Sequence, residues 1–264
     1  MQAHKNGCSP FQWREDVTHV NAVITKVVEE AHNIRTFFFD TSFELIPGQF
    51  VMVWIRGVDE VPMALSYENA ITVQKIGPAT SALFELKECD SVGIRGPFGK
   101  GFDIEKGWLL LVSGGVGAAP IAPLAEKAGE AGATITTLLG AKTQEELLFR
   151  KRFEAVGNVR VATDDGTEGK HGYVTQLLED EKDFDQRYCC GPEPMMKKVL
   201  DKVTPKKAQF SLHRYIKCGL GICGACCVDG LRVCKDGPVF SGDVLKKTEF
   251  GVYRRNECGG RVKI

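Results

Sequence analysis

The residues of this chain with the most specific chemistry are cysteines. Five of its ten cysteines lie in the stretch CGLGICGACCVDGLRVC, which begins at Cys218 and ends at Cys234. Cys218, Cys223 and Cys226 have the spacing C-x4-C-x2-C, which is the spacing of plant-type [2Fe–2S] proteins. Cys234 follows after seven more residues, and three thiolates on one loop with a fourth from a neighbouring turn can hold such a cluster. The spacing therefore predicts a [2Fe–2S] centre.

Two other uses of these cysteines stay open. Structural zinc sites usually take two C-x2-C pairs, and this stretch contains one, Cys223 and Cys226. The same pair could work as a redox dithiol, although that motif is typical of a position beside a β–α–β unit. Cys227 is expected to be a spectator, because adjacent cysteines do not easily point at one centre.

Two glycine-containing turns are candidate phosphate sites. SGGVGAAP (residues 113–120) follows the apolar run WLLLV, and CGPEPMM (residues 190–196) follows another apolar run. Such turns bring backbone N–H groups and a helix N-terminus to the carboxyl end of a parallel strand, where ligands bind. A plain strand-to-helix turn stays open for the first, which lacks the pattern G-x-G-x-x-G. The candidate residues are Gly114, Gly115, Gly117, Ala119, Pro120, Cys190, Gly191 and Pro192.

The elements that must position these residues fall into three zones. Residues 15–104 contain short runs rich in Val, Ile, Thr and Phe, separated by Pro-Gly and Gly-Pro turns, which predicts an antiparallel β-barrel. Residues 105–205 alternate strand-length apolar runs with helix-like stretches, including 144–157 and 172–180, which predicts a parallel α/β domain. Residues 206–264 are too few to bury a core alone, so we expect a metal centre to hold them together. The predicted fold class is multi-domain α+β.

Composition narrows the function classes. The chain has 264 residues, with 34 basic and 34 acidic side chains, and this balance argues against binding to nucleic acid or to acidic membranes. Its first sixteen residues contain no apolar signal-peptide core. The longest uncharged run, residues 107–125, is interrupted by prolines and glycines, so it is not expected to span a membrane. These features predict a soluble, cytoplasmic protein.

The order of these motifs resembles the ferredoxin–NADP reductase superfamily and, within it, the electron-transfer subunits of NAD-dependent dihydroorotate dehydrogenase B. The most specific match is RYIKCGLGICGACCVDGLRVCKDGPVF, residues 214–240. The segments RGPFGKGF (95–102) and TDDGTEGKHGYVT (163–175) also resemble segments of that family. The resemblance implies that a [2Fe–2S] cluster is ligated by Cys218, Cys223, Cys226 and Cys234.

The resemblance also implies an FAD site on the barrel, and this is where the chain departs from the family. Family members carry R-P-x-S on a barrel strand, whereas residues 61–66 read VPMALS, with neither the arginine nor the serine in register. We expect Ser66 or Lys75 to compensate, and FAD to bind more weakly, with FMN a less favoured occupant. The residues implied for FAD are Pro62, Met63, Ala64, Leu65, Ser66, Ile71, Thr72, Val73, Gly77, Ala79, Thr80, Gly96, Pro97 and Gly99.

The function implied by the resemblance is electron transfer in pyrimidine biosynthesis. Electrons would pass between a partner FMN-containing dihydroorotate dehydrogenase subunit, in a heterotetramer, and NAD⁺ bound to the central zone. The flavin would connect the two-electron nicotinamide to the one-electron cluster, and an apolar patch around residues 218–226 would face the partner. No catalytic acid or base is assigned in this chain.

Two alternatives stay open. The first is a flavin and iron–sulfur subunit of another complex, such as a sulfhydrogenase, a sulfite reductase or a bifurcating transhydrogenase. The second is a zinc-stabilised binding protein without enzymatic activity.

Overall fold

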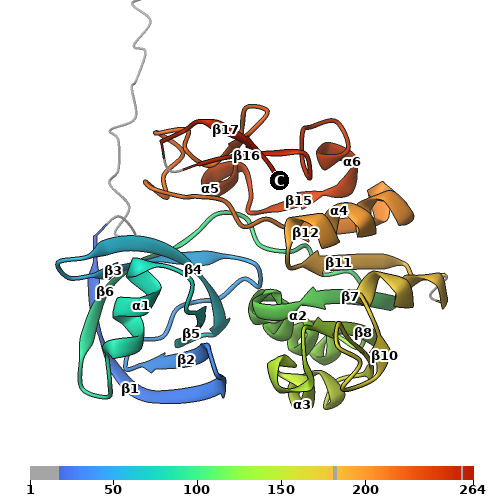
Figure 1. Cartoon of the computed structure of the whole chain (residues 1–264), viewed down its shortest axis with the longest axis horizontal. Helices are drawn as coiled ribbons and strands as arrows, with labels where there is room; N and C mark the ends of the chain where they lie inside the picture. The colour runs from blue at the N-terminus through green and yellow to red at the C-terminus, as the bar shows by residue number, and fades with distance from the viewer. Residues whose placement is uncertain (1–17, 181–182, 257) are drawn as a thin grey trace, which may run out of the picture.

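The computed structural model describes residues 18–180, 183–256 and 258–264. Figure 1 shows a barrel in blue and teal, an α/β layer in green and yellow, and a C-terminal part in orange and red that lies above both. The predicted absence of a signal peptide concerns residues that lie outside the described ones. Among the described residues, no helix has the length and apolar character needed to cross a membrane.

The first part is a closed antiparallel barrel, as the short alternating runs predicted. Its strands follow the order β1-β2-β5-β4-β3-β6 around the barrel. Their bounds are Val20–Ala31 (β1), Ile34–Phe39 (β2), Phe50–Ile55 (β3), Asp59–Tyr67 (β4), Ala70–Gln74 (β5) and Ser91–Phe98 (β6). Helix α1 (Pro78–Glu85) buries Leu83 and Phe84 against the barrel core, so the turn expected at this position continues into a helix.

The second part is a mostly parallel sheet with the order β10-β9-β8-β7-β11-β12-β15. The strands are Lys170–His171 (β10), Asn158–Thr163 (β9), Thr134–Ala141 (β8), Trp108–Gly114 (β7), Gln186–Cys190 (β11), Ala208–Ser211 (β12) and Val239–Ser241 (β15). Helix α2 (Ala118–Glu130) packs on one face and helix α4 (Glu193–Lys202) on the other. The chain proceeds outward from β7 on one side and returns at β11 on the other, so the switch point lies between β7 and β11, where open sheets of this kind bind ligands.

The prediction of a continuous α-helix is wrong for two segments. Residues 144–157 form a short 3₁₀ helix (Gln144–Glu146) followed by helix α3 (Arg150–Glu154). Between them, Phe149 takes a left-handed φ of 57°, and its ring packs edge-on against Tyr67 of the barrel. The segment Val174–Asp180 is a 3₁₀ helix. A tertiary contact to the barrel therefore competes with helical periodicity at Phe149.

The C-terminal part is built on the edge of the central sheet. Strands β12 and β15 extend that sheet, and the remaining elements are β13 (Cys227–Val228), β14 (Leu231–Arg232), α5 (Val233–Asp236), α6 (Gly242–Leu245), β16 (Tyr253–Arg255) and β17 (Arg261–Lys263). Its core is continuous with its neighbours, because Cys226 and Cys234 belong to the same buried cluster as Met52 and Phe98 of the barrel. The predicted boundaries 15–104, 105–205 and 206–264 stay predictions.

Candidate functional site

The four cysteines of the C-x4-C-x2-C…C pattern converge on one loop and one short helix. Cys218, Cys223 and Cys226 lie on the loop that leads into β13, and Cys234 lies in α5. Cys226 and Cys234 are buried, whereas Cys223 is exposed. The loop bends through glycines with φ near +70°, a conformation that glycine adopts without strain. These are Gly219, Gly221 and Gly224.

The four thiols are arranged as two pairs. The side-chain contacts that shift the thiol pKa values join Cys218 to Cys223 and Cys226 to Cys234. Among the residues that the structure describes, no three His, Cys, Asp or Glu side chains are gathered closely enough for one metal ion. A single zinc ion needs four ligands around one point, whereas a [2Fe–2S] cluster takes two ligands at each of two irons. The paired arrangement fits the cluster better than it fits zinc.

Backbone N–H groups point at the sulfur atoms. Leu220 N donates to Cys218 Sγ at 3.4 Å, and Gly221 N donates to Cys234 Sγ at 3.1 Å. Cys234 N donates to Cys226 Sγ at 3.4 Å. Such donors stabilise negative charge on sulfur, and they are one of the means by which a protein sets a cluster's reduction potential.

These donors prepare the thiols to bind metal. Burial opposes ionisation of Cys218, but the N–H groups of the following loop outweigh it and lower its pKa to about 7. The thiol of Cys234 donates to Cys226 and lowers the pKa of Cys226 to about 6, while the pKa of Cys234 is raised. Because the thiolate is the form that binds metal, lowered thiol pKa values favour ligation.

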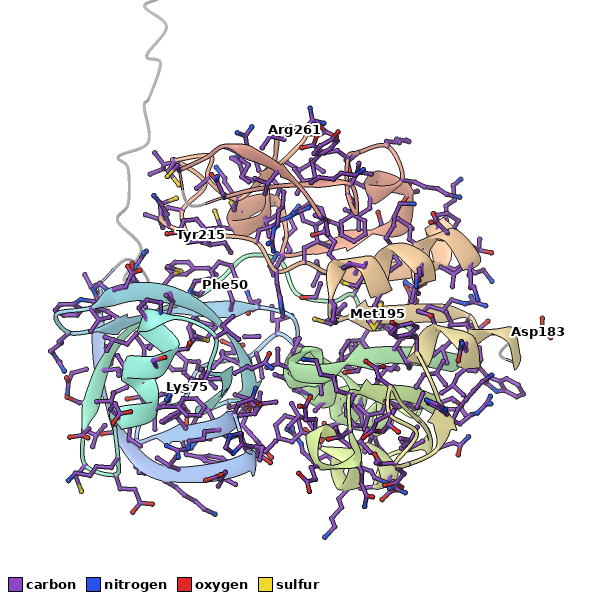
Figure 2. The ribbon with its side chains drawn as sticks, in the orientation of Figure 1. Phe50, Lys75, Asp183, Met195, Tyr215 and Arg261 are labelled. Carbon is purple, nitrogen blue, oxygen red and sulfur yellow. The ribbon has the colours of Figure 1, made fainter. Side chains whose placement is uncertain are left out.

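The cluster loop is attached to the barrel by Arg95, the first residue of the segment RGPFGKGF. Arg95 of β6 donates to both carboxylate oxygens of Glu60, at 2.6 and 2.7 Å, and to the main-chain oxygen of Cys218 at 3.0 Å. Nearby, Lys100 N donates to Gly237 O at 2.5 Å, so the D-G-P turn after α5 contacts the turn after β6. In Figure 2, Tyr215 lies where the C-terminal part faces the barrel, with Phe50 below it.

The structure divides the expected flavin residues into accessible and buried ones. Pro62, Met63 and Ala64 are half-buried, but the hydroxyl of Ser66 is inside the barrel wall, where it accepts a hydrogen bond from Thr72 Oγ1 at 2.8 Å. Leu65, Ile71, Thr72 and Val73 are likewise buried. The hydroxyl of Ser66 is therefore already engaged with Thr72, and the expectation that Ser66 compensates at the flavin site stays a prediction.

The other expected compensation, Lys75, lies at the start of the turn that leads into α1. Its Nζ lies 5.7 Å from the ring centre of Phe84. Gly77, Ala79 and Thr80 form the N-terminus of α1, and Thr80 Oγ1 accepts hydrogen bonds from the N–H groups of Ile76 and Gly77, both at 2.9 Å. Gly96, Pro97 and Gly99 lie at and just beyond the end of β6, beside Arg95.

A second arginine joins the barrel to the α/β layer. Arg152 of α3 donates to both carboxylate oxygens of Glu126 at 2.7 and 2.8 Å, and to the main-chain oxygen of Ser66 at 3.0 Å. Its guanidinium lies 3.9 Å from the ring centre of Tyr67. Arg95 begins the segment RGPFGKGF, but the sequence does not indicate either contact, because each joins residues far apart in the chain.

The two nucleotide turns meet at the switch point of the sheet. Gly115 (φ 53°) and Gly117 lie in the 3₁₀ turn before α2, and a Cβ at Gly117 would clash with the carbonyl of Cys190. A Cβ at Gly114 would lie 2.6 Å from Met195 Sδ. Figure 2 shows Met195 near the centre of the molecule, where this edge of the sheet faces the barrel. Glycine is needed here for space.

Cys190 ends β11 within a row of small polar groups. Its register partners are Ser113 on β7 and Ser211 on β12. Its Sγ lies 3.6 Å from His213 Nε2. Burial raises the pKa of Cys190 to about 12, so this thiol stays protonated. Of the other candidate residues, Ala119 and Pro120 lie in the first turn of α2, and Gly191 and Pro192 directly follow β11.

Comparisons with known proteins agree with this geometry. Residues 213–246 match the family model described as the iron-sulfur cluster binding domain of dihydroorotate dehydrogenase B, and residues 111–201 match an oxidoreductase NAD-binding domain. A probable dihydroorotate dehydrogenase B (NAD(+)), electron transfer subunit, from Methanocella arvoryzae is 56% identical over 255 residues, which cover 93% of this chain and 99% of that protein. The protein of the same name from Methanocaldococcus jannaschii is 47% identical, covering 90% and 96%.

Solved structures show the same arrangement. A structure of an NADH-dependent reduced ferredoxin-NADP oxidoreductase, described for flavin-based electron bifurcation, superposes with a TM-score of 0.78 at 33% identity, covering 87% of this chain and 90% of that one. A flavohemoglobin from Malassezia yamatoensis shares the fold at 14% identity, with a TM-score of 0.66 and coverage of 74% and 60%.

Proposed function

The chain belongs to the family of electron transfer subunits of dihydroorotate dehydrogenase B, and from this premise we propose how its residues carry electrons. It exchanges electrons with a catalytic subunit that oxidises dihydroorotate to orotate, and with NAD⁺. FAD, when bound, can exchange electrons singly with a cluster or as a hydride with a nicotinamide. The observation that carries the proposal is the convergence of backbone N–H groups on the sulfur atoms of Cys218, Cys226 and Cys234, in a loop that Arg95 joins to the barrel.

The cysteines divide into ligands and a bystander. Cys218, Cys223, Cys226 and Cys234 would hold the [2Fe–2S] cluster. Cys227 follows directly after a ligand and starts β13, and burial and the neighbouring Cys226 raise its pKa, so it is not prepared to bind metal.

The flavin and the nicotinamide would use backbone more than side chains. The turn at Gly77–Thr80 presents the N-terminus of α1, and Gly96, Pro97 and Gly99 border the cluster loop. Pro62, Met63 and Ala64 would present an uncharged surface to the flavin. The turns at Gly114–Pro120 and Cys190–Pro192 would hold NAD(H) at the switch point of the sheet.

The partner would dock at the tip of the cluster loop. Residues 219–226 contain no charged side chain, Ile222 is 81% exposed, and Cys223 beside it is exposed. An exposed apolar side chain next to a cluster ligand is suited to burial in an interface. We place the FMN-containing catalytic subunit here, in a heterotetramer of two copies of each chain.

The cysteine assignment is tested by a matched pair of variants. Cys223→Ser should abolish dihydroorotate-dependent NAD⁺ reduction in the complex, while NADH still bleaches the flavin absorbance at a rate close to that of the parent. Cys227→Ser, four residues along, should retain both reactions. Electron transfer to NAD⁺ that survives in Cys223→Ser would overturn the serial path through the cluster.

One solved structure favours a second candidate. The 33% identity to the NADH-dependent reduced ferredoxin-NADP oxidoreductase extends over 87% of the chain, so a role in a bifurcating complex is the alternative to test. Such a protein would reduce NADP⁺ with NADH and reduced ferredoxin, and dihydroorotate would not be a substrate. An assay that supplies dihydroorotate or reduced ferredoxin as the electron donor therefore distinguishes the two candidate functions.

The free state of the cysteines supports a location in the cytoplasm. All nine cysteines in the described ranges are free thiols. Free thiols and iron–sulfur ligands persist in a reducing compartment, whereas secreted proteins tend to oxidise them to disulfides. Fractionation of source cells, with the chain detected beside known cytoplasmic and envelope markers, would test this placement.

A further inference from the structure

Arg95 occupies an unusual position between the barrel and the cluster loop. Its side chain is 8% exposed, and it lies near the end of β6, directly before Gly96 and Pro97. It donates to both oxygens of Glu60, and its Nη2 also donates to the main-chain oxygen of Cys218 at 3.0 Å. A buried cation therefore lies between a carboxylate and the backbone of a proposed cluster ligand.

The two charges of this ion pair differ in their access to water. Glu60 is 21% exposed, contacts His19 Nε2 at 2.8 Å, and lines a surface cavity of about 490 Å³ with Trp54 and Asp59. Burial opposes its ionisation, but hydrogen bonds from Arg95 and His19 outweigh it and lower the pKa of Glu60, so the pair is ionic. Water screens the carboxylate more than the guanidinium, and a net positive potential remains at the loop.

We propose that Arg95 is a positioning residue for electron transfer, which fixes the cluster loop against the barrel and raises the reduction potential of the cluster. Reduction adds one negative charge to a cluster, and a nearby cation stabilises that reduced form. Because the carboxylate of Glu60 is paired with the same guanidinium, it offsets part of this effect. The inference rests on the proposed assignment of the cluster to the four cysteines.

A second cation near the loop provides a contrast. Arg232 Nη1 donates to Gly221 O at 3.3 Å, but its side chain is 39% exposed and pairs with Asp236. Water screens an exposed ion pair of this kind. We therefore assign the larger electrostatic effect to Arg95.

The test uses the sign of the change in potential. The holoprotein is purified anaerobically, and its cluster is titrated with redox mediators while the reduced form is followed by electron paramagnetic resonance. Arg95→Gln should raise the ratio of oxidised to reduced cluster at fixed potential by about tenfold, which corresponds to about 59 mV for one electron. Glu60→Gln removes the offsetting charge and should shift the ratio in the opposite direction.

Two further variants separate charge from mechanical support. Arg95→Lys keeps the cation but loses the paired hydrogen bonds, so its potential should stay closer to the parent than that of Arg95→Gln. Arg152→Gln removes the other arginine that joins the barrel to its neighbour and should leave the potential unchanged. A purely structural role predicts that Arg95→Gln and Glu60→Gln loosen the same contact and move the potential in the same direction.

Opposite shifts in Arg95→Gln and Glu60→Gln would support the proposal, and equal signs or no shift would overturn it. If Arg95→Gln fails to assemble the cluster, Glu60→Gln decides: a raised potential supports the inference, and a lowered or unchanged one overturns it. Absence of the signal in the parent protein would overturn the cluster assignment itself, and this inference with it.

Discussion

The cysteines of the cluster loop and those at the end of β11 are held in opposite ways. Backbone N–H groups converge on Cys218 and lower its pKa to about 7, whereas Cys189 and Cys190 are buried in the sheet and their pKa values are raised. The two regions contain the same type of side chain within one chain. The comparison shows that the backbone around a thiol, more than the presence of a thiol, decides whether it can become a ligand.

The largest contrast is expected from serine substitutions in the two regions. Cys234→Ser should remove most of the iron, because it takes away one of four ligands. Cys189→Ser should retain the iron and lower the free energy of unfolding by about 1–3 kcal/mol, because it buries a hydroxyl in an apolar site. Iron per chain and denaturant unfolding measure the two effects. Iron loss in Cys189→Ser would break the comparison.

Glycine substitutions sharpen the same contrast. Gly117→Ala should cost about 2–3 kcal/mol, because the added methyl group clashes with the backbone at Cys190. Gly224 has φ +71°, and a Cβ added there would meet only Cys227 Sγ, at 3.8 Å. Gly224→Asn should therefore cost about 1 kcal/mol or less, since asparagine tolerates this conformation. Chemical denaturation compares them. A larger cost at Gly224 would show that the loop, rather than the sheet edge, is limited by space.

The raised thiol pKa at the sheet predicts a loss of stability in alkali. Burial raises the pKa of Cys190 to about 12 in the folded protein, from 9.0. Its neutral form therefore contributes stability that is present below about pH 9 and is lost as the pH rises toward 12, when the unfolded chain ionises first. Cys190→Ala should remove this loss of unfolding free energy, which is about 4 kcal/mol for a pKa shift of this size.

Tyr188 must be controlled for in that experiment. Burial also raises its pKa to about 12, from 10.0. Its hydroxyl donates to Asp103 O at 2.8 Å and accepts from Glu105 N at 2.9 Å. Tyr188→Phe should therefore reduce the pH dependence of the unfolding free energy from about pH 10 upward, which is a higher pH than for Cys190→Ala. If the unfolding free energies of the parent and Cys190→Ala changed identically with pH below about 10, the loss of stability would not come from the Cys190 thiol.

The smallest effect is expected at Arg232. This residue and Asp236 form a largely exposed pair four positions apart, so Arg232→Gln should leave the free energy of unfolding close to that of the parent. Its effect on the cluster potential should be smaller than that of Arg95→Gln. A potential shift equal to that of Arg95→Gln would mean that screening does not distinguish the two cations.

The sequence predicted those parts of the fold and the site that depend on residues close together in the chain. These parts are the short apolar strands of the barrel, the alternation of strands and helices, and the cysteine spacing. The resemblance to a known family agreed with their order along the chain. The segment at Phe149 could not be predicted as a break, because its cause is a contact with Tyr67 in another part of the fold. The use of β12 and β15 to extend the central sheet is likewise a result of tertiary pairing.

The contacts around the cluster were beyond local patterns for the same reason. Arg95 and Cys218 are 123 positions apart, and Arg152 and Ser66 are 86 apart. Arg95 begins the segment RGPFGKGF, which does not indicate its contact with Cys218, and Arg152 belongs to none of the motifs. The occupied hydroxyl of Ser66 depends on its pairing with Thr72 across the barrel.

The central claim is that this chain connects dihydroorotate oxidation to NAD⁺. The most direct measurement is anaerobic NADH formation from dihydroorotate and NAD⁺, with the chain isolated in its native complex and with the catalytic subunit alone. We expect one NADH per dihydroorotate from the complex and none from the catalytic subunit alone. NAD⁺ reduction by the catalytic subunit alone, or a flavin- and iron-containing complex inactive with dihydroorotate, would contradict the account.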